Sequence, residues 1–370
     1  MYIFYTTMNI NNIEDQNGLL SFTLEHAHLP LVNGLRRTIL SDIPLVGIKG
    51  FPHDACDIKI IENDTNLNNE IMKHRIMSIP VYSLNPESND IWSKVKVVLN
   101  VQNDTEQMIS VTTENITLIN TDNGNKISDA TTKKIFPPDP LTNGYILICY
   151  LQPVSDKMKK SNQLYFEATF SVLSPKDSSV YNCVSKSTFS NSIDLEKQEL
   201  GWSEYQKTLL PDDNMEKEKQ NWKVLKGQRY FKENSFDFAI KSIGFYTNKE
   251  ILIKAFNIII NHIDSISKSS GIKIEKSKKT VMENSFDIII QNHSYTIGNI
   301  LKKIAYDLFY GKDITYVGFV VEHPHDSFSI LRLSYSSVVD ESRVSQTLQE
   351  TCMKSIEYIQ QILSLVEHNL

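Results

Sequence analysis

A strand followed by a helix occurs twice in this chain, once near each end. The first helix reads LVNGLRRTIL at 31–40, and the second reads IGNILKKIAY at 297–306. Aligned without gaps, they share an asparagine, a leucine and a basic pair: Asn33/Asn299, Leu35/Leu301 and Arg36-Arg37/Lys302-Lys303. Two equivalent helices in one chain can face each other across a pseudo-twofold axis, as in an isologous dimer. The repeat therefore predicts two related halves paired within one polypeptide.

The local signals around the first copy agree with this prediction. Residues 19–28 alternate between apolar and polar, as expected for a half-buried strand. Pro30 suits a first helical turn, and Pro44 disfavours helix at the residue before it. A helix is therefore expected from Pro30 until the Asp42–Pro44 stretch.

The middle of the chain has a different pattern. From 44 to about 190, short runs rich in Val, Ile, Thr and Tyr, such as ISVTTENITLI from Ile109, alternate with turn-forming clusters such as NPESND. This pattern predicts a β-rich module. Residues 191–232 are polar and weakly periodic, with Trp202 and Trp222 embedded, and they predict a long surface excursion.

The rest of the chain alternates strands with long helices. A strand is expected from Phe236, and a helix capped by Asn248 is expected to run to about Ile263, before a Ser/Lys-rich linker. After the second strand-helix unit and a further strand pair, apolar residues at steps of three and four predict a long amphipathic helix: Val344, Leu348, Cys352, Ile356, Ile359, Ile362 and Val366.

Composition argues against several functions. With a net charge of −6, the chain as a whole is not an electrostatic partner for phosphate backbones. Its four cysteines form no CxxC pair, so neither a structural zinc site nor a disulfide framework is expected, and each is read as a small buried residue of a reduced, intracellular protein. No signal peptide is expected, because the start MYIFYTTMNINN lacks a basic region followed by an apolar core. No membrane span is expected, because the most apolar stretch, 251–263, is 13 residues long and contains Lys254 and Asn257.

Enzymatic motifs are missing from the sequence. It has no Walker-type loop, no GxGxxG after a strand, no HExxH and no closely spaced aspartates for two metals. His26 and His28 would share one face of a strand, but no third ligand is nearby, which favours packing or surface roles. No catalytic residue and no cofactor is therefore predicted.

Several stretches resemble the alpha-like subunits of multisubunit RNA polymerases. NGLRRTILSDIP is similar to the first-helix signature of the third-largest eukaryotic subunit, its D-type archaeal counterpart and, more distantly, bacterial alpha. NDTNLNNEIMKHRIMSIPV from Asn63 resembles that family's next conserved segment, with matches at Asn63, Leu67, Glu70, His74, Arg75, Ile79 and Pro80. FSVLSPKDSSVYNC from Phe170 resembles the Ser-Pro segment near the end of the family's inserted module.

The second half resembles the small partner of that protein, the L-type archaeal polypeptide. The matches lie in SYTIGNIL and GFVVEHPH, at Thr296, Gly298, Asn299, Leu301, Gly318, His323 and Pro324. Together the resemblances cover nearly the whole chain in the right order. They imply a fusion of the two polymerase polypeptides, as in some large DNA viruses of eukaryotes. Tyr295 stands where the small partner usually has histidine. The cysteine cluster that binds zinc or an iron-sulfur cluster in many relatives is missing from this sequence, so no metal site is predicted from the resemblance.

The resemblance defines the predicted fold class. It is α+β: two alpha-like dimerisation domains, each an antiparallel sheet with helices, paired intramolecularly, with a β-rich module inserted into the first. The expected first domain comprises 1–48 and 191–268, and the module comprises 49–190. A linker at 269–280 leads to the second, L-like domain at 281–370.

The resemblance also implies a role. The paired domains would form a non-catalytic platform on which the largest and second-largest polymerase subunits assemble, together with other small subunits, without direct DNA binding and without a membrane. A viral protein of this kind is expected in the host cytoplasm or a virus factory, and the virion is a further possible location. The interface between the halves is expected at Leu31, Leu35, Ile39, Ile297, Leu301 and Ile304. Contacts with a large subunit are expected at Asn33, Arg36, Arg37, Glu70, His74 and Arg75.

Two alternatives from other classes stay open. A stand-alone sheet-rich nucleic-acid-binding protein would use the basic residues of the linker: Lys273, Lys276, Lys278 and Lys279. Salt-dependent binding of the isolated chain to DNA would favour it. An independent enzyme would show activity without partners.

Overall fold

The computed structural model describes residues 8–88, 92–154, 161–209, 214–269, 272–278 and 280–370. Contacts between residues divide the chain into two compact units. One unit contains the chain up to Leu40 together with Val184–Leu370, and the other is Ser41–Cys183. Each unit has its own core and is described separately.

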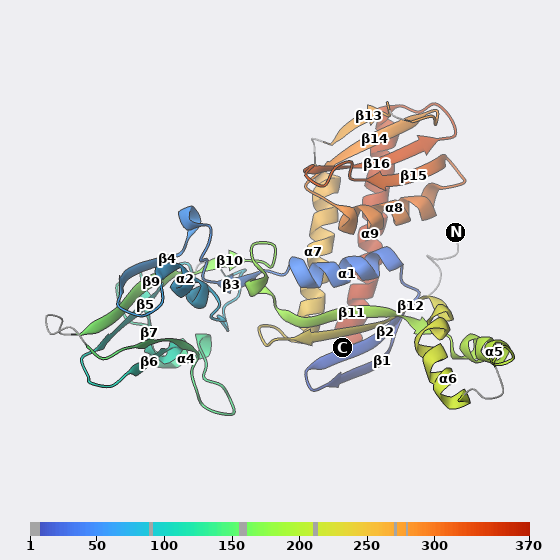
Figure 1. Cartoon of the computed structure of the whole chain (residues 1–370). Coiled ribbons are helices and arrows are strands. Elements are labelled where there is room, and N and C mark those ends of the chain that lie inside the picture. Colours follow the sequence, from blue (N-terminus) through green and yellow to red (C-terminus); the bar gives the residue numbers. More distant parts are fainter. Residues whose placement is uncertain (1–7, 89–91, 155–160, 210–213, 270–271, 279) are drawn as a thin grey trace. The chain divides into compact units, whose positions relative to one another are not determined.

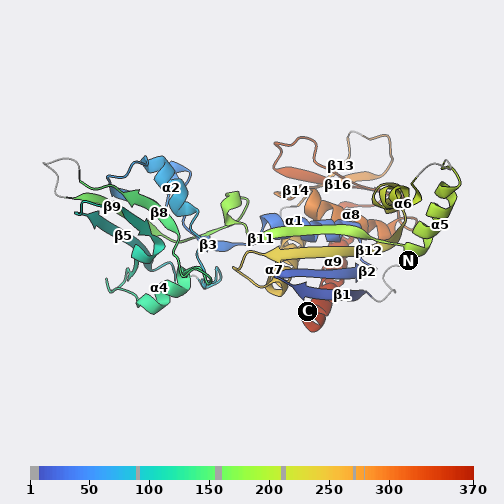
Figure 2. The same ribbon diagram turned by 60° about the horizontal axis from the view of Figure 1, so that its bottom comes forward.

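The first unit contains two four-stranded antiparallel sheets. The first sheet has the order β1-β2-β12-β11 (Figure 2), with strands at Asn9–Gln16, Leu19–Glu25, Phe231–Ser242 and Val184–Ile193. The second sheet has the order β13-β14-β16-β15, with strands at Lys273–Lys276, Ser285–Gln291, Phe328–Tyr335 and Ile314–Val320. Successive side chains of a strand point to opposite faces, so alternate residues such as Leu20, Phe22 and Leu24 are buried.

The two sheets share one topology. In each, a strand pair is followed by a helix, a second strand pair and a second helix. The helices of the first half are α1 (Leu29–Ser41) and α7 (Asn248–Lys268), and those of the second half are α8 (Tyr295–Phe309) and α9 (Glu341–Asn369). The second half therefore repeats the first element by element, and the unit at 41–183 and a helical hairpin at 195–224 are additions to the first half alone.

Helices α7 and α9 lie side by side and connect the two halves (Figure 1). The apolar stripe predicted for the C-terminal helix is buried at Val344, Leu348, Cys352, Ile359, Ile362 and Val366, whereas Ile356 is only half-buried. The amine of Lys249 also donates a hydrogen bond to the carbonyl of Glu367, at 2.9 Å. No helix in the described part of the chain is both long and apolar enough to span a bilayer.

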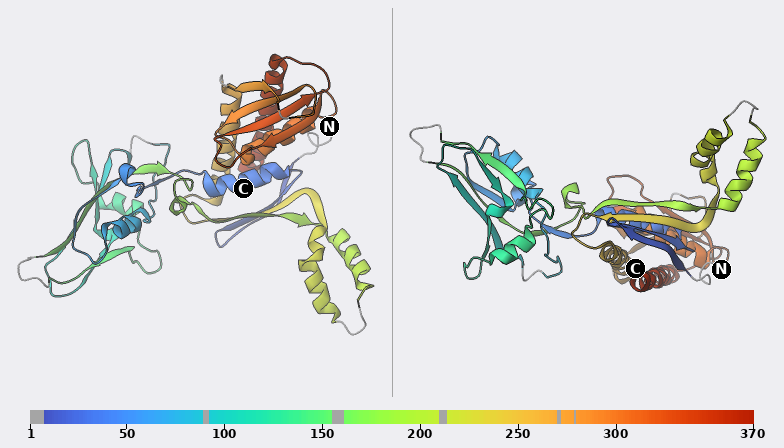
Figure 3. Two further views of the ribbon diagram at one scale, coloured as in Figure 1. Left: turned by 45° about the horizontal axis from the view of Figure 1, so that its top comes forward. Right: turned by 90° about the horizontal axis from the view of Figure 1, so that it is seen from below.

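The excursion at 191–232 contains two helices that the sequence did not predict. Helix α5 (Leu195–Gln206) and helix α6 (Met215–Val224) form a hairpin (Figure 3), followed by a 3-10 turn, η5 (Lys226–Arg229). Trp202 and Trp222 pack in its centre with ring centroids 5.7 Å apart. Few other side chains of the two helices are buried, which explains their weak hydrophobic periodicity.

The second unit is rich in β-structure, as expected. Its main sheet has the order β4-β9-β5-β7, with strands at Ile58–Asn63, Asn162–Thr169, Val95–Asn103 and Ile116–Asn120. Two smaller pairs join β6 (Ile109–Thr112) to β8 (Leu147–Leu151) and β3 (Leu45–Gly47) to β10 (Ser171–Leu173). Its helices are α2 (Asn69–Met77) and α4 (Asp129–Ile135), and its 3-10 turns are η2 (His53–Ala55), η3 (Thr113–Asn115) and η4 (Ser179–Tyr181).

The limits of this unit differ from those expected for the inserted module. The sequence suggested 49–190, whereas the compact unit runs from Ser41 to Cys183. β3 pairs with β10, and both strands lie inside this unit. β11 pairs with β12, and both strands belong to the first unit. Strand pairing thus places both boundaries several residues earlier. The division of the first unit into two dimerisation domains stays a prediction.

The run from Ile109 forms two strands, β6 and β7, because the side chain of Asn115 accepts a hydrogen bond from the Thr112 amide and forms a 3-10 turn between them. One local expectation was wrong. Asn248 does not cap α7. Thr247 does, in a capping box with Glu250, and α7 continues to Lys268.

The capping box of α7 gives a test of local stability with a control in the same chain. Thr247→Ala removes a side-chain hydrogen bond to the amide of Glu250 and should lower the free energy of unfolding by about 1 kcal/mol. Ser294 occupies the equivalent position before α8 but makes no capping bond, so Ser294→Ala should cost much less. Chemical denaturation of both variants measures the difference. Equal losses would contradict this assignment of the caps.

Candidate functional site: the groove between helices α1 and α8

The two motif helices cross at a small residue. A Cβ atom added to Gly34 of α1 would lie 3.1 Å from Cδ1 of Ile300 on α8 and 3.6 Å from the carbonyl oxygen of Thr296. Any larger side chain at Gly34 would have to displace Ile300. The lack of a side chain at Gly34 thus allows the two helices to approach closely.

Around this crossing, the residues expected at the interface between the halves are all buried. They are Leu31, Leu35 and Ile39 of α1 with Ile297, Leu301 and Ile304 of α8, and none is more than 4% exposed. They lie on the apolar stripes of their helices, at the spacing of three and four residues that the sequence shows. Their assignment to a paired interface stays a prediction.

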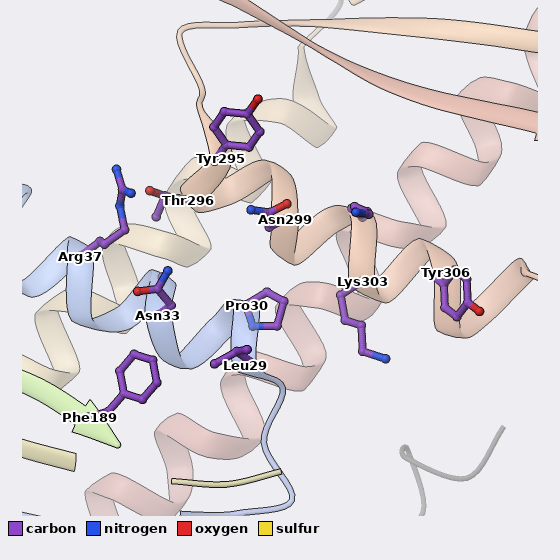
Figure 4. Close-up of a pocket in the computed structure, with 12 residues that line it drawn as sticks. Leu29, Pro30, Asn33, Arg37, Phe189, Tyr295, Thr296, Asn299, Lys303 and Tyr306 are labelled. Atoms are coloured by element: carbon purple, nitrogen blue, oxygen red, sulfur yellow. The ribbon is translucent and has the colours of Figure 1, made fainter. Parts of the chain in front are cut away.

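Beside the crossing lies an open groove of about 730 Å³ (Figure 4). Its lining combines apolar or aromatic side chains with amides and cations: Leu29, Pro30, Asn33, Gly34, Arg37, Phe189, Tyr295, Thr296, Asn299, Lys302, Lys303 and Tyr306. None of these lining residues is acidic. The groove therefore offers a positive, partly apolar surface, and both copies of the repeated motif contribute to it.

The two arginines of the first motif have different surroundings. Arg37 is exposed and lines the groove. Arg36 does not line it, and its Nε and Nη2 donate hydrogen bonds to Oδ1 of Asn33, at 3.2 and 3.0 Å. Of the expected large-subunit contacts on this helix, Asn33 and Arg37 thus face the groove, and Arg36 holds the Asn33 amide in place.

A buried polar cluster lies between the halves at the beginning of α1. Nε2 of His28 is 3.4 Å from Oδ2 of Asp307 on α8. The backbone amide of His28 donates a hydrogen bond to the hydroxyl of Tyr358 on α9, at 2.9 Å. Nζ of Lys303 lies 2.6 Å from the other oxygen of Asp307. His28 is only 2% exposed, so it is a packing residue rather than a surface one, and it follows β2 instead of belonging to a strand.

Burial determines the protonation of this cluster. Desolvation lowers the pKa of His28 from 6.5 to about 4, although Asp307 acts in the opposite direction. Burial also raises the pKa of Tyr358 well above its ordinary value. Among the described residues, Nδ1 of His28 and Oδ2 of Asp307 have no hydrogen-bond partner. At neutral pH the cluster therefore contains a neutral imidazole, a neutral phenol and one ion pair.

The expected contact residues of the second unit lie on α2. Glu70 is exposed and lines a separate hollow of about 540 Å³. The ring of His74 stacks on Phe51 with centroids 4.4 Å apart. Nε and Nη2 of Arg75 donate hydrogen bonds to the carbonyls of Ile148 and Leu147 on β8, at 2.5 and 2.9 Å. Arg75 thus stabilises its own unit, and contact of these three residues with a large subunit stays untested.

Sequence reasoning missed several groove residues. Phe189 comes from β11, far from both motifs in the chain, and no local pattern points to it. Tyr306 was detectable in principle, because it and Tyr310 are four residues apart on one face of α8, and their rings stack at 4.3 Å. Asp307 and Tyr358 of the buried cluster gave no signal in the sequence.

Other chemistry has little support in the structure. Cys149, Cys183 and Cys352 are buried, as expected, and burial raises their thiol pKa values to about 11, 12 and 12. No group of three potential metal ligands occurs in the part of the chain that the structure describes. Of the lysines expected in a linker, Lys273 and Lys276 belong to strand β13 of the second sheet, Lys273 pairs with Glu275, and Lys279 lies outside the described residues.

Comparison with known proteins decides the family. The profile of the family described as RNA polymerase Rpb3/Rpb11 dimerisation domain matches residues 21–263. The chain belongs to this family. The match extends from β2 to α7 and so includes the first half apart from β1, together with the unit at 41–183, and the predicted α+β class is confirmed.

Individual relatives are distant. The chain is 30% identical over 74 residues to the DNA-directed RNA polymerase subunit Rpo3 of Pyrococcus furiosus, which is 20% of this chain and 26% of that protein. It is 32% identical over 69 residues to Rpo3 of Thermococcus kodakarensis, 19% of this chain and 24% of that protein. A conjugation stage-specific protein of Tetrahymena thermophila is 28% identical over 116 residues, 28% of this chain and 34% of that protein. The chain thus matches about a third or less of each relative's length.

A charge placed in the helix crossing should disrupt the first unit. Leu35 is 1% exposed, so Leu35→Asp would bury a carboxylate without a partner and cost several kcal/mol of stability. Leu29→Asp is the matched control on the same helix, because Leu29 is 51% exposed at the groove edge. Thermal unfolding should show a large loss for the first variant and little for the second. Similar curves for both would contradict close packing at Leu35.

The pKa of His28 predicts a dependence of stability on pH. Its folded-state pKa lies below its unfolded value, so unfolding takes up a proton between about pH 6.5 and 4, and this contribution to stability is lost as the pH falls through that range. The melting temperature of the wild type should therefore fall more steeply there than that of His28→Gln, which cannot titrate. Calorimetry across this pH range measures both slopes, and parallel slopes would contradict the prediction.

Proposed function

We propose that this chain is a non-catalytic platform subunit of a DNA-directed RNA polymerase, in which two alpha-like halves pair within one polypeptide. The family assignment and the Rpo3 relatives support a role in polymerase assembly. The second half lies outside the matched residues, so the proposal that it acts as the partner domain depends on the structure.

The observation that carries the proposal is the identity of the residues at the helix crossing. In the ungapped alignment of LVNGLRRTIL with IGNILKKIAY, Gly34 is the counterpart of Ile300. These are the two residues whose positions meet where α1 and α8 cross. Residues on a twofold axis contact their own counterparts, so this pair supports a pseudo-twofold axis through the crossing. The repeated topology of the two sheets supports the same arrangement.

The Gly34–Ile300 pair also favours the pairing of two different halves over the pairing of two identical ones. An isoleucine fits opposite a glycine, whereas two isoleucines would clash and two glycines would leave a void. A half built on α1 would therefore pair better with the second half than with its own copy. Joining the two halves in one chain also keeps the matching partner at a high effective concentration. These features support a fusion of two partner subunits, which we propose as in large DNA viruses of eukaryotes, with function in the host cytoplasm or virus factory.

The groove at α1 and α8 is the proposed contact with the second-largest subunit. Arg37 and Lys302 supply positive charge beside apolar side chains, which suits a protein segment that combines carboxylates with apolar residues, whereas Lys303 is paired with Asp307. The largest subunit and other small subunits are proposed to bind elsewhere on the platform. Catalysis would then belong to the large subunits, and direct DNA binding is not expected of a chain with a net charge of −6.

Co-purification tests this proposal. Arg36→Ala combined with Arg37→Ala should leave the fold intact and weaken capture of the second-largest subunit, measured by affinity purification and mass spectrometry. Arg37→Ala alone should cause most of the loss, because Arg37 lines the groove and Arg36 bonds to Asn33. Lys133→Ala with Lys134→Ala is the control, since both lysines are exposed on α4 of the other unit. Capture of the second-largest subunit that equals wild type in the double arginine variant would argue against the groove as its contact.

A further inference from the structure

The connection between equivalent strands is very unequal in the two halves. In the second half, residues 321–327 suffice to join β15 to β16. In the first half, residues 194–230 join β11 to β12 and contain the α5–α6 hairpin. The sheet topology is the same in both, so the fold does not require the hairpin. The comparison between the two halves therefore points to a role for the hairpin other than completing the fold.

The hairpin is an ordered structure with its own aromatic core. Trp222 packs against Trp202, Tyr205 and Tyr230, with centroid distances of 5.7, 6.3 and 5.7 Å. Both helices begin at side-chain caps, where Asp194 accepts a hydrogen bond from the amide of Lys197 and Asn214 accepts one from the amide of Lys217. An ordered element can present a surface to a partner at a lower entropic cost than a flexible loop.

The end of the hairpin that leads into β12 combines positive charge with aliphatic side chains. The stretch from Lys219 to Lys232 contains five basic residues and no acidic one, and Lys219 is paired with Glu199 of α5. Within it, Val224 and Leu225 are each 71% exposed. The side chain of Gln228 donates a hydrogen bond to the carbonyl of Lys223, at 3.0 Å, which folds η5 back onto the end of α6. We call the resulting surface, made by Lys223, Val224, Leu225, Lys226 and Arg229, the basic knob.

We propose that the basic knob binds an acidic protein segment that carries aliphatic side chains, such as an amphipathic helix. Charge complementarity with its three cations selects carboxylates, and the two exposed aliphatic residues need an apolar surface to cover them. Lys226 is positioned by Tyr205, whose ring centroid lies 4.2 Å from its Nζ. This proposal depends only on the hairpin and is independent of the polymerase assignment.

A single-stranded nucleic acid is a poorer match to the knob. Proteins that bind single strands stack bases on exposed aromatic rings. Trp202 and Trp222 are each 4% exposed and are occupied by packing inside the hairpin. At the knob itself, the exposed apolar groups are aliphatic. Within the knob a nucleic acid would find phosphate contacts but no aromatic side chain, and the ring of Phe231, which follows the knob in the chain, is 39% exposed.

Fluorescence anisotropy with the purified full chain tests the proposal. The probe is a labelled helical peptide with leucines on one face and glutamates on the other. Comparison probes are the same peptide with lysine in place of glutamate, oligoglutamate, single-stranded oligouridine and phosphatidylserine vesicles. The first probe should bind most tightly, and its affinity should fall as the salt concentration rises.

One variant tests the contribution of charge to binding, and a second tests the contribution of the aliphatic side chains. Lys223→Glu with Arg229→Glu reverses two charges but keeps Lys226 on Tyr205, and Val224→Ser with Leu225→Ser removes the aliphatic surface. Each should weaken binding of the first probe by about tenfold or more. The matched controls are Lys133→Glu with Lys134→Glu and Leu141→Ser, because those lysines are exposed and Leu141 is 93% exposed in the other unit. These controls should bind like wild type.

Several results would overturn the proposal. They are no binding of the glutamate-leucine peptide, unchanged binding by the two knob variants, or equal weakening by the controls. Tighter binding of oligouridine or of vesicles, lost in the knob variants, would show that the knob serves a different class of partner.

Discussion

The close crossing of α1 and α8 is the contact on which the first unit depends. Each helix covers one face of its own sheet and also has apolar residues directed at the other half. Ile300 fits against the backbone of Gly34, and the aliphatic side chains on the apolar stripes of both helices are buried. The second helices, α7 and α9, then pack along each other. Neither half would bury its apolar surface alone, which explains why contacts place both in one compact unit.

A polar cluster accompanies this apolar contact. His28 precedes α1, Asp307 and Lys303 lie on α8 and Tyr358 lies on α9, and these residues meet at the beginning of α1. Buried polar groups without partners are costly, so a shift of one helix against the others would separate the His28–Tyr358 hydrogen bond and leave both groups buried without it. The aliphatic residues thus supply most of the stabilisation, and the polar cluster limits the registers in which the halves can pair.

The two halves share a topology but carry different additions. The second half consists of little more than its sheet and helices, whereas the first half carries the unit at 41–183 and the α5–α6 hairpin. The unit at 41–183 is inserted between the end of α1 and the beginning of β11, and the hairpin is inserted after the end of β11. Insertions at these points do not interrupt sheet pairing. The repeated framework therefore accounts for the common fold of the two halves, and the structural differences between them are concentrated in the additions.

Local sequence patterns alone determined most elements of this protein. The helical spacing of Leu31, Leu35 and Ile39, the alternation in β2 and the long stripe of α9 all report burial on one face, which is a local property of each element. The α5 and α6 helices escaped prediction because their burial is concentrated in aromatic residues that pack on one another. Tertiary structure alone decided that Gly34 meets Ile300, that Phe189 reaches the groove and that His28 loses its charge beside Asp307 and Tyr358. Each of these features joins residues distant in the chain, and their packing and desolvation arise only when the two halves fold together.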